Sequence, residues 1–107
     1  MNFCPWYPLV EAEAHALTTP GVFQVRIARG LIEYPRGKSA MIHYGQGQDV
    51  RAAACAFAAA HPGVDWLCRH AVELTAREHA LGWGGAFAVL VDTFAQRFGT
   101  PPRLPGD

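Results

Sequence analysis

The chain has 107 residues, of which half are hydrophobic and 17% are charged. This length allows one domain with its own core, and nine basic and nine acidic side chains leave no net charge. Proteins that hold nucleic acid through its phosphates usually carry a basic excess or a basic stripe. We therefore expect a single domain over residues 1–107, with its core at about 6–104 and with nucleic acid as a weak partner at most.

Neither a membrane segment nor a signal peptide is indicated. The uncharged stretch His79–Val91 is well short of the roughly 20 apolar residues that a membrane-spanning helix needs. Residues 1–6 have neither the basic n-region nor the long apolar h-region of a secretion signal. Cys4, Cys55 and Cys68 are odd in number and show no C-x-x-C spacing, which argues against a disulfide framework and against structural zinc. We expect a cytoplasmic protein with no membrane partner and no bound cofactor.

The first predicted element is an N-terminal helix. Residues 5–17 begin with two prolines and continue with helix-forming Ala and Glu, and residues 18–21 end the segment. The apolar residues that we expect on its buried face are Leu9, Val10, Ala14 and Leu17.

Two strands follow. From Val22 to Ile27 apolar and polar residues alternate, which predicts a half-buried strand whose buried face includes Phe23 and Val25. A turn at residues 34–37 precedes a second strand over residues 40–44. Because few residues join the two strands, we expect them to pair antiparallel.

A glycine-containing turn at residues 45–48 is expected to end the second strand. Asp49 then predicts the N-cap of a helix over Val50–Ala60, which His61-Pro62-Gly63 ends. The expected buried stripe of this helix comprises Val50, Ala54, Phe57 and Ala58.

The last third of the chain predicts a strand and a helix. Residues 66–72 alternate in character, which favours a third strand, with a helix as the alternative. Residues 74–98 have helical composition with a break at the glycines of 82–85, and Gly99 ends them. The predicted class is α+β, with a small three-stranded, mainly antiparallel sheet flanked by helices.

Three segments resemble the GIY-YIG nuclease superfamily. They are Pro20-Gly21-Val22-Phe23 at the first strand, Ile42-His43-Tyr44-Gly45 at the second, and the closing Phe98-Gly99-Thr100-Pro101-Pro102-Arg103-Leu104. The resemblance extends from about Trp6 to Leu104 and implies a three-stranded antiparallel sheet with flanking helices, which agrees with the predicted class.

The resemblance also implies which residues would do the chemistry. Phe23 stands where the family's first motif ends in tyrosine, and His43 stands where the second motif begins with tyrosine. The family's arginine falls on Ala53. Arg51 lies two residues before that position. On a helix this offset rotates the side chain by about 200°, so Arg51 is expected to point away from the place of the family's arginine.

The family's metal-binding glutamate has two possible equivalents. Counting forward through the third strand gives Glu78, whereas counting back from Phe98 leads to Phe87 and no glutamate. Pro105 replaces the asparagine of the closing segment. Glu78 would be a metal ligand, for an ion such as Mg²⁺, only if nuclease activity survives, and one carboxylate leaves little to neutralise a phosphoryl transition state.

Three functions remain open. The first is a catalytically degenerate GIY-YIG-like domain that serves as a binding or accessory module for a protein partner or a small-molecule ligand. The second is a repurposed enzyme in the former nuclease cleft, with His43 as acid or base and Glu78 or Arg51 as its partner. The third is a metal-dependent DNA endonuclease. A structural role is the alternative for each of these three candidate residues: His43 on a half-buried strand, Arg51 in a helix's first turn, and Glu78 on a solvent-facing helix surface.

Overall fold

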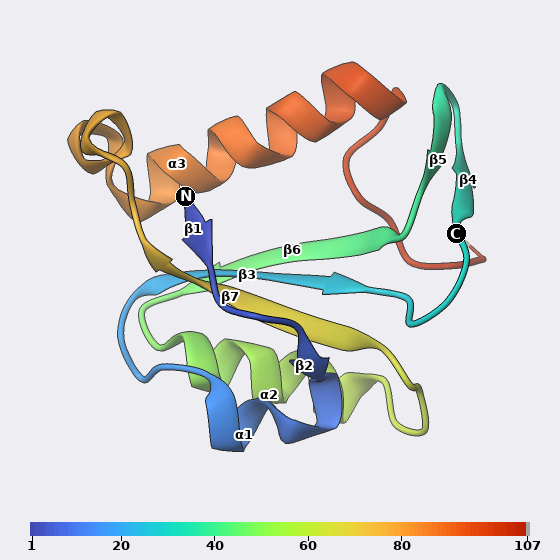
Figure 1. Ribbon diagram of the computed structural model, residues 1–107, viewed down its shortest axis with the longest axis horizontal. Coiled ribbons are helices and arrows are strands. Elements are labelled where there is room, and N and C mark those ends of the chain that lie inside the picture. Colours follow the sequence, from blue (N-terminus) through green and yellow to red (C-terminus); the bar gives the residue numbers. More distant parts are fainter. Residues whose placement is uncertain (107) are drawn as a thin grey trace.

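The centre of the fold is an antiparallel sheet in the strand order β7-β3-β6, shown by a computed structural model that describes residues 1–106. Helices α1 and α2 cover one face of this sheet and α3 covers the other (Figure 1). The predicted α+β class is therefore confirmed. The elements are β1 (Asn2–Phe3), β2 (Tyr7–Pro8), η1 (Leu9–Glu11), α1 (Ala12–His15), β3 (Gly21–Arg26), β4 (Ile32–Tyr34), β5 (Gly37–Ser39), β6 (Met41–Gly47), α2 (Val50–Ala60), β7 (Leu67–Glu73) and α3 (Ala76–Phe98).

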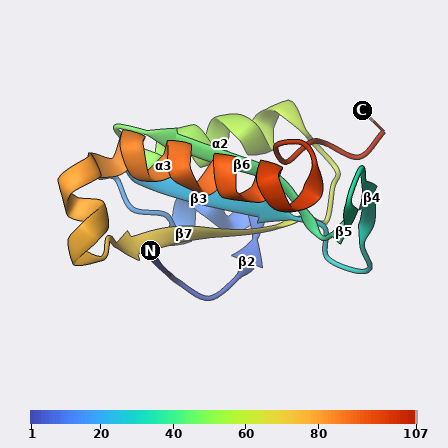
Figure 2. The same ribbon diagram turned by 90° about the horizontal axis from the view of Figure 1, so that it is seen from above.

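Strand β3 is buried on both faces, so the prediction of a half-buried strand was wrong. The central position of β3 places it between β6 and β7, and α3 runs along the sheet face opposite α2 (Figure 2). Gln24, on the opposite face of the strand from Phe23 and Val25, is only 3% exposed. Its side-chain oxygen accepts a hydrogen bond of 2.8 Å from Arg69 Nε, which offsets part of the cost of burying the amide.

The N-terminal segment differs from the predicted helix. Tyr7–Pro8 pairs with β7, and only a 3₁₀ turn and one short α-helix follow. Because the helical turns begin later than expected, the buried positions are Leu9, Ala12 and Ala16, whereas Val10 is 71% exposed and Ala14 and Leu17 are exposed as well. The backbone N–H of Leu9 donates to Trp66 O at 2.9 Å, which ties this segment to the residue before β7.

Residues 45–47 belong to β6 and not to the predicted turn. They pair with β3 out to Gly21↔Gly47, so the second strand is longer than expected. Glycine at 45 is required by packing, because a Cβ there would clash with the aromatic ring of Phe23. The glycine signal thus marks a close approach of a ring to a strand rather than a change of chain direction.

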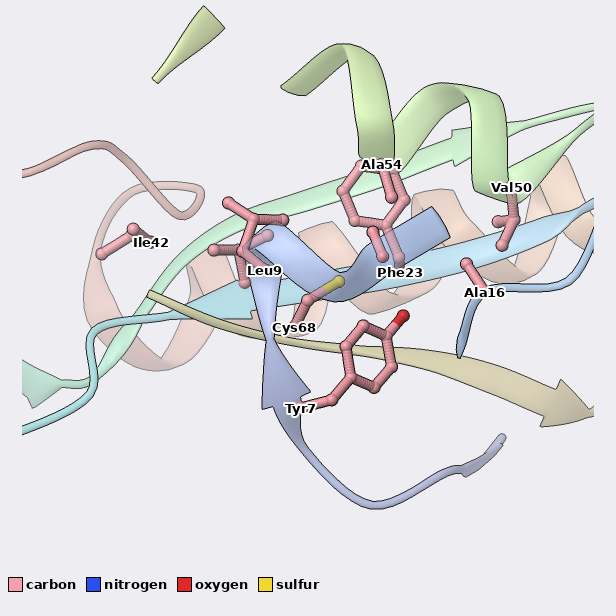
Figure 3. Close-up of a cluster of buried hydrophobic side chains, with 10 residues drawn as sticks. Tyr7, Leu9, Ala16, Phe23, Ile42, Val50, Ala54 and Cys68 are labelled. Atoms are coloured by element: carbon pink, nitrogen blue, oxygen red, sulfur yellow. The ribbon is translucent and has the colours of Figure 1, made fainter. Parts of the chain in front are cut away.

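Helix α2 follows the prediction closely. The carboxylate of Asp49 accepts a hydrogen bond from Ala52 N at 3.0 Å, which is the expected N-cap. Val50 and Ala54 are buried, and Ala54 lies over the Phe23 ring in the core (Figure 3). Phe57 and Ala58 are half-buried and complete the stripe.

Strand β7 confirms the third predicted strand, and α3 confirms the last helix with its break. Thr75 and Glu78 form a capping box at the start of α3. Gly82 interrupts the helix with φ 70° and ψ 176°, and Gly99 ends it at φ 91°. Within residues 1–106 we find no helix with both the length and the apolarity to cross a membrane.

A β4–β5 hairpin, not predicted from the sequence, stands at the C-terminal end of α3 (Figure 1). Arg36 fastens it there: its guanidinium donates to Gln96 O at 2.6 Å, and its backbone N–H donates to Phe98 O at 3.0 Å. The Tyr34 ring packs edge-on against Phe94, with centroids 5.1 Å apart. These contacts satisfy carbonyls that the helix end leaves without partners.

Candidate functional site

His43 projects from β6 toward α2 and packs among aromatic rings. Its imidazole stacks on Phe57 with centroids 4.1 Å apart, and Phe23 is tilted against it at 5.6 Å. Burial lowers the pKa of His43, and the nearby His61 adds to this effect. The ring is therefore a neutral part of an aromatic cluster at physiological pH.

Arg51 joins α2 to the preceding segment. Its Nε donates to Ala16 O at 2.8 Å, and its backbone N–H donates to Leu17 O at 2.9 Å. Val50 N donates to Thr19 O at 3.1 Å. The N-terminal donors of α2 thus bind the chain's own carbonyls, which leaves this helix end saturated rather than open to an anion.

Glu78 lies at the start of α3, on the other side of the sheet from α2. Its carboxylate accepts a hydrogen bond from Thr75 N at 2.9 Å and forms an ion pair of 2.7 Å with the Met1 ammonium. The ammonium, followed by the Thr75 backbone, lowers the pKa of Glu78 to about 2. Phe87, the other candidate equivalent, is half-buried on α3.

The structure does not bring His43, Arg51 and Glu78 together. Each contacts a different element, and within residues 1–106 we find no hydrogen bond or ion pair that joins any two of them. Phe23, at the first motif position, is 2% exposed and lies over Gly45 at the second. The two positions are thus adjacent in space, but aromatic packing fills the region between them.

Burial of His43 predicts a loss of stability in mild acid. Its pKa is lower in the folded chain than in the unfolded one, so the unfolded state takes up the proton first as pH falls below about 6.5. We expect the free energy of unfolding, measured by urea titration, to fall from pH 7 to pH 5. His43→Phe should reduce this dependence of stability on pH. Part of the dependence should remain, because burial also lowers the pKa of His70. An unchanged pH dependence in His43→Phe would contradict the argument.

An open groove of about 440 Å³ lies between the hairpin, β6 and the C-terminal half of α3. Its larger apolar lining residues are Leu31, Met41, Tyr44, Leu90, Phe94 and Phe98. The hairpin forms one wall because Tyr34 holds it against the sheet, donating its hydroxyl to Met41 O at 2.6 Å. Lys38 and Arg97 also line the groove, so it combines an apolar surface with two cations.

A second cavity of about 370 Å³ lies where the N-terminal segment with β1 and β2 pairs along β7, and Cys4 and His70 are among the residues that line it. Sequence reasoning assigned neither residue a functional role. The only available signal was the presence of a thiol and an imidazole, because their 66-residue separation hides the contact.

No protein-family model matches the chain, and searches of curated proteins and of solved structures returned no match.

Proposed function

We propose that the protein is a binding module with a GIY-YIG-like fold, and that it docks an acidic, apolar segment of a partner protein. The groove beside α3 carries this proposal. Its volume of about 440 Å³ is within the usual range for ligand sites, which are mostly apolar with a few polar groups. Leu31, on its hairpin wall, is 61% exposed, so apolar surface continues beyond the groove as a protein partner requires.

Charge supports an acidic partner. The Arg97 guanidinium lies 5.0 Å from the Phe98 ring centroid, and no ion pair within residues 1–106 engages it. Lys38 pairs with Glu33 at 3.4 Å, but both side chains are well exposed and such pairs contribute little. A carboxylate on the partner would therefore meet two cations at low cost.

The residues at the motif positions support binding over phosphodiester cleavage. Phe23 has no hydroxyl, and Ala53 provides no cation where the family has arginine. Glu78 is engaged by Thr75 and by the Met1 ammonium. His43, the proposed acid or base of a repurposed enzyme, has its ring against Phe57, which favours the structural alternative. The three cysteines are free, in keeping with the proposed cytoplasmic location.

Selection from a displayed library of random peptides tests the groove. We expect wild-type protein to enrich sequences that combine carboxylates with large apolar residues. Thr93, exposed on α3 and lining the groove, is replaced by glutamate, which lies one helical turn before Arg97, pairs with that cation and repels an acidic peptide. Thr93→Glu should weaken binding of the selected peptides at least about tenfold. Ala88→Glu, at an exposed position of the same helix outside the groove, is the matched control and should bind as wild type does.

Two results would overturn the proposal. One is a set of selected peptides that lacks acidic residues, or a set that binds Thr93→Glu and wild type equally. The other is cleavage of plasmid DNA in Mg²⁺ or Mn²⁺ that Glu78→Gln abolishes, because this would establish the endonuclease alternative.

A further inference from the structure

Cys4 and His70 face each other across the edge of the sheet. The Sγ atom of Cys4 lies 3.4 Å from Nδ1 of His70. The backbone N–H of His70 donates to the same sulfur at 3.4 Å, and Cys4 N donates to His70 O at 3.0 Å. The backbone thus fixes the thiol beside the imidazole, and the N–H group is placed to stabilise negative charge on sulfur.

The surroundings of His70 leave Nδ1 able to accept a proton. Tyr7 Oη lies 3.1 Å from this atom, and burial raises the pKa of Tyr7, so the phenol stays protonated. Nδ1 has a single lone pair, and it accepts from the Cys4 thiol when the phenol donates to its other partner, Cys68. Burial, with a contribution from His15, lowers the pKa of His70 and keeps the imidazole neutral. A neutral ring that accepts at Nδ1 carries its own proton on Nε2. The thiol of Cys4 therefore points at a base and not at an imidazolium.

This pair opens onto the cavity of about 370 Å³, whose other lining residues are Pro5, Trp6, Tyr7 and His15. None of the lining residues is acidic, and the Glu11 carboxylate that pairs with the lining His15 at 3.2 Å is exposed to solvent. A small molecule that enters the cavity can thus approach the sulfur without meeting a negative charge at the wall.

Two guanidinium groups lie against the ring of Trp6, which lines the cavity. The Cζ atoms of Arg69 and Arg26 lie 4.4 and 4.8 Å from the Trp6 ring centroid. Within residues 1–106 neither arginine forms an ion pair, and Arg26 Nε is buried without a hydrogen-bond partner. The two cations beside the cavity therefore favour an anionic reactant.

We propose that Cys4 and His70 form a thiol-exchange site that takes low-molecular-weight disulfides bearing carboxylates. The proton on Sγ of Cys4 moves to Nδ1 of His70, while the sulfur electron pair forms a bond to one sulfur of the disulfide. The S–S bond of the reactant breaks, and the departing thiolate takes the proton from His70. The products are a mixed disulfide on Cys4 and one free thiol, and a reducing thiol reverses the reaction.

The other two cysteines provide references within the same chain. Cys68 is fully buried, and burial raises its pKa to about 11, so it should stay unreactive in the folded protein. Cys55 is half-buried on α2 and outside the cavity, so it reports the reactivity of a thiol without the His70 contact.

The experiment measures mixed-disulfide formation at each cysteine by peptide mass spectrometry, with oxidised glutathione as the anionic probe and cystamine as the cationic one. At pH 7 we expect Cys4 to react with oxidised glutathione at least about tenfold faster than Cys55, because general bases usually contribute that much or more. His70→Asn should remove this advantage. Cystamine should react more slowly than oxidised glutathione at Cys4, with a difference that shrinks at high salt.

Equal rates at Cys4 and Cys55 in the wild-type protein would overturn the site, and this comparison stands even if His70→Asn fails to fold. A folded His70→Asn variant whose Cys4 reacts at the wild-type rate would also overturn it. Equal or faster reaction of cystamine at Cys4 would remove the preference for carboxylates. Because the groove beside α3 is a separate site, loss of peptide binding and loss of thiol exchange are distinguishable.

Discussion

Replacing Gly45 with alanine is expected to lower the free energy of unfolding by about 3 kcal/mol, at the upper end of overpacking effects. An added Cβ would overlap ring atoms Cε1 and Cζ of Phe23, and both residues are buried. Phe23 has no room to retreat, because its ring contacts His43 and Phe57 on the α2 side. The strand or the ring must shift, and either movement disturbs the centre of the core.

Urea unfolding monitored by circular dichroism measures this effect. Gly84→Ala is the matched control: a Cβ at 84 meets only Gln46 Oε1 at 3.9 Å, and alanine in a helix gains up to about 1 kcal/mol over glycine. Phe23→Leu introduced together with Gly45→Ala should recover part of the loss that Gly45→Ala causes alone. A Gly45→Ala protein as stable as wild type would show that the ring does not press on this strand.

Local patterns predict a large part of this fold. Asp49 caps α2 because an N-cap needs only its own side chain and the next turn. The glycines at 82–85 predict the break in α3 for the same reason, since Gly82 adopts a positive φ that other residues avoid. The alternation of residues 66–72 predicts β7 because side chains on a strand point to opposite faces.

The errors arise where distant segments decide the structure. Residues 45–47 have turn composition, yet pairing with β3 and the Phe23 ring hold them in a strand. Gln24 is polar and nevertheless buried, because Arg69 from β7 satisfies its amide oxygen. The β4–β5 hairpin depends on Arg36 and Tyr34 meeting the end of α3. None of these partners is adjacent in the chain, so no local period shows them.

In the candidate site, too, local sequence predicts some features, whereas contacts between distant segments decide others. The sequence places Phe23 on the first predicted strand and Gly45 just after the second, and the structure pairs these two residues directly. Whether the space between such positions is open depends on Phe57 and His43, whose stacking is a tertiary contact. Cys4 and His70 were visible only as separate residues, and their contact depends on the N-terminal segment lying along β7. A motif therefore predicts the position of a site more readily than it predicts whether side chains fill that site.

Phe94→Ala is expected to produce the other large effect, a loss of about 3–5 kcal/mol in the free energy of unfolding. Phe94 is buried at the point where α3, β6 and the hairpin meet, with its ring centroid 4.5 Å from Phe98, 5.1 Å from Tyr34 and 5.6 Å from Tyr44. Removing the ring leaves a void beneath the groove and takes away the surface on which the hairpin rests. Thermal and urea unfolding provide the measurement.

Val89→Ala is the matched control, because Val89 lies on the same helix, is 54% exposed and should change stability by less than about 0.5 kcal/mol. Phe94→Leu keeps part of the volume, so it should remain folded while binding selected peptides more weakly than wild type. The pairing of a stability loss with a binding loss follows from one arrangement, in which the same ring supports the hairpin and lines the groove. A folded Phe94→Leu protein with unchanged peptide affinity would separate the two and place the docking surface elsewhere.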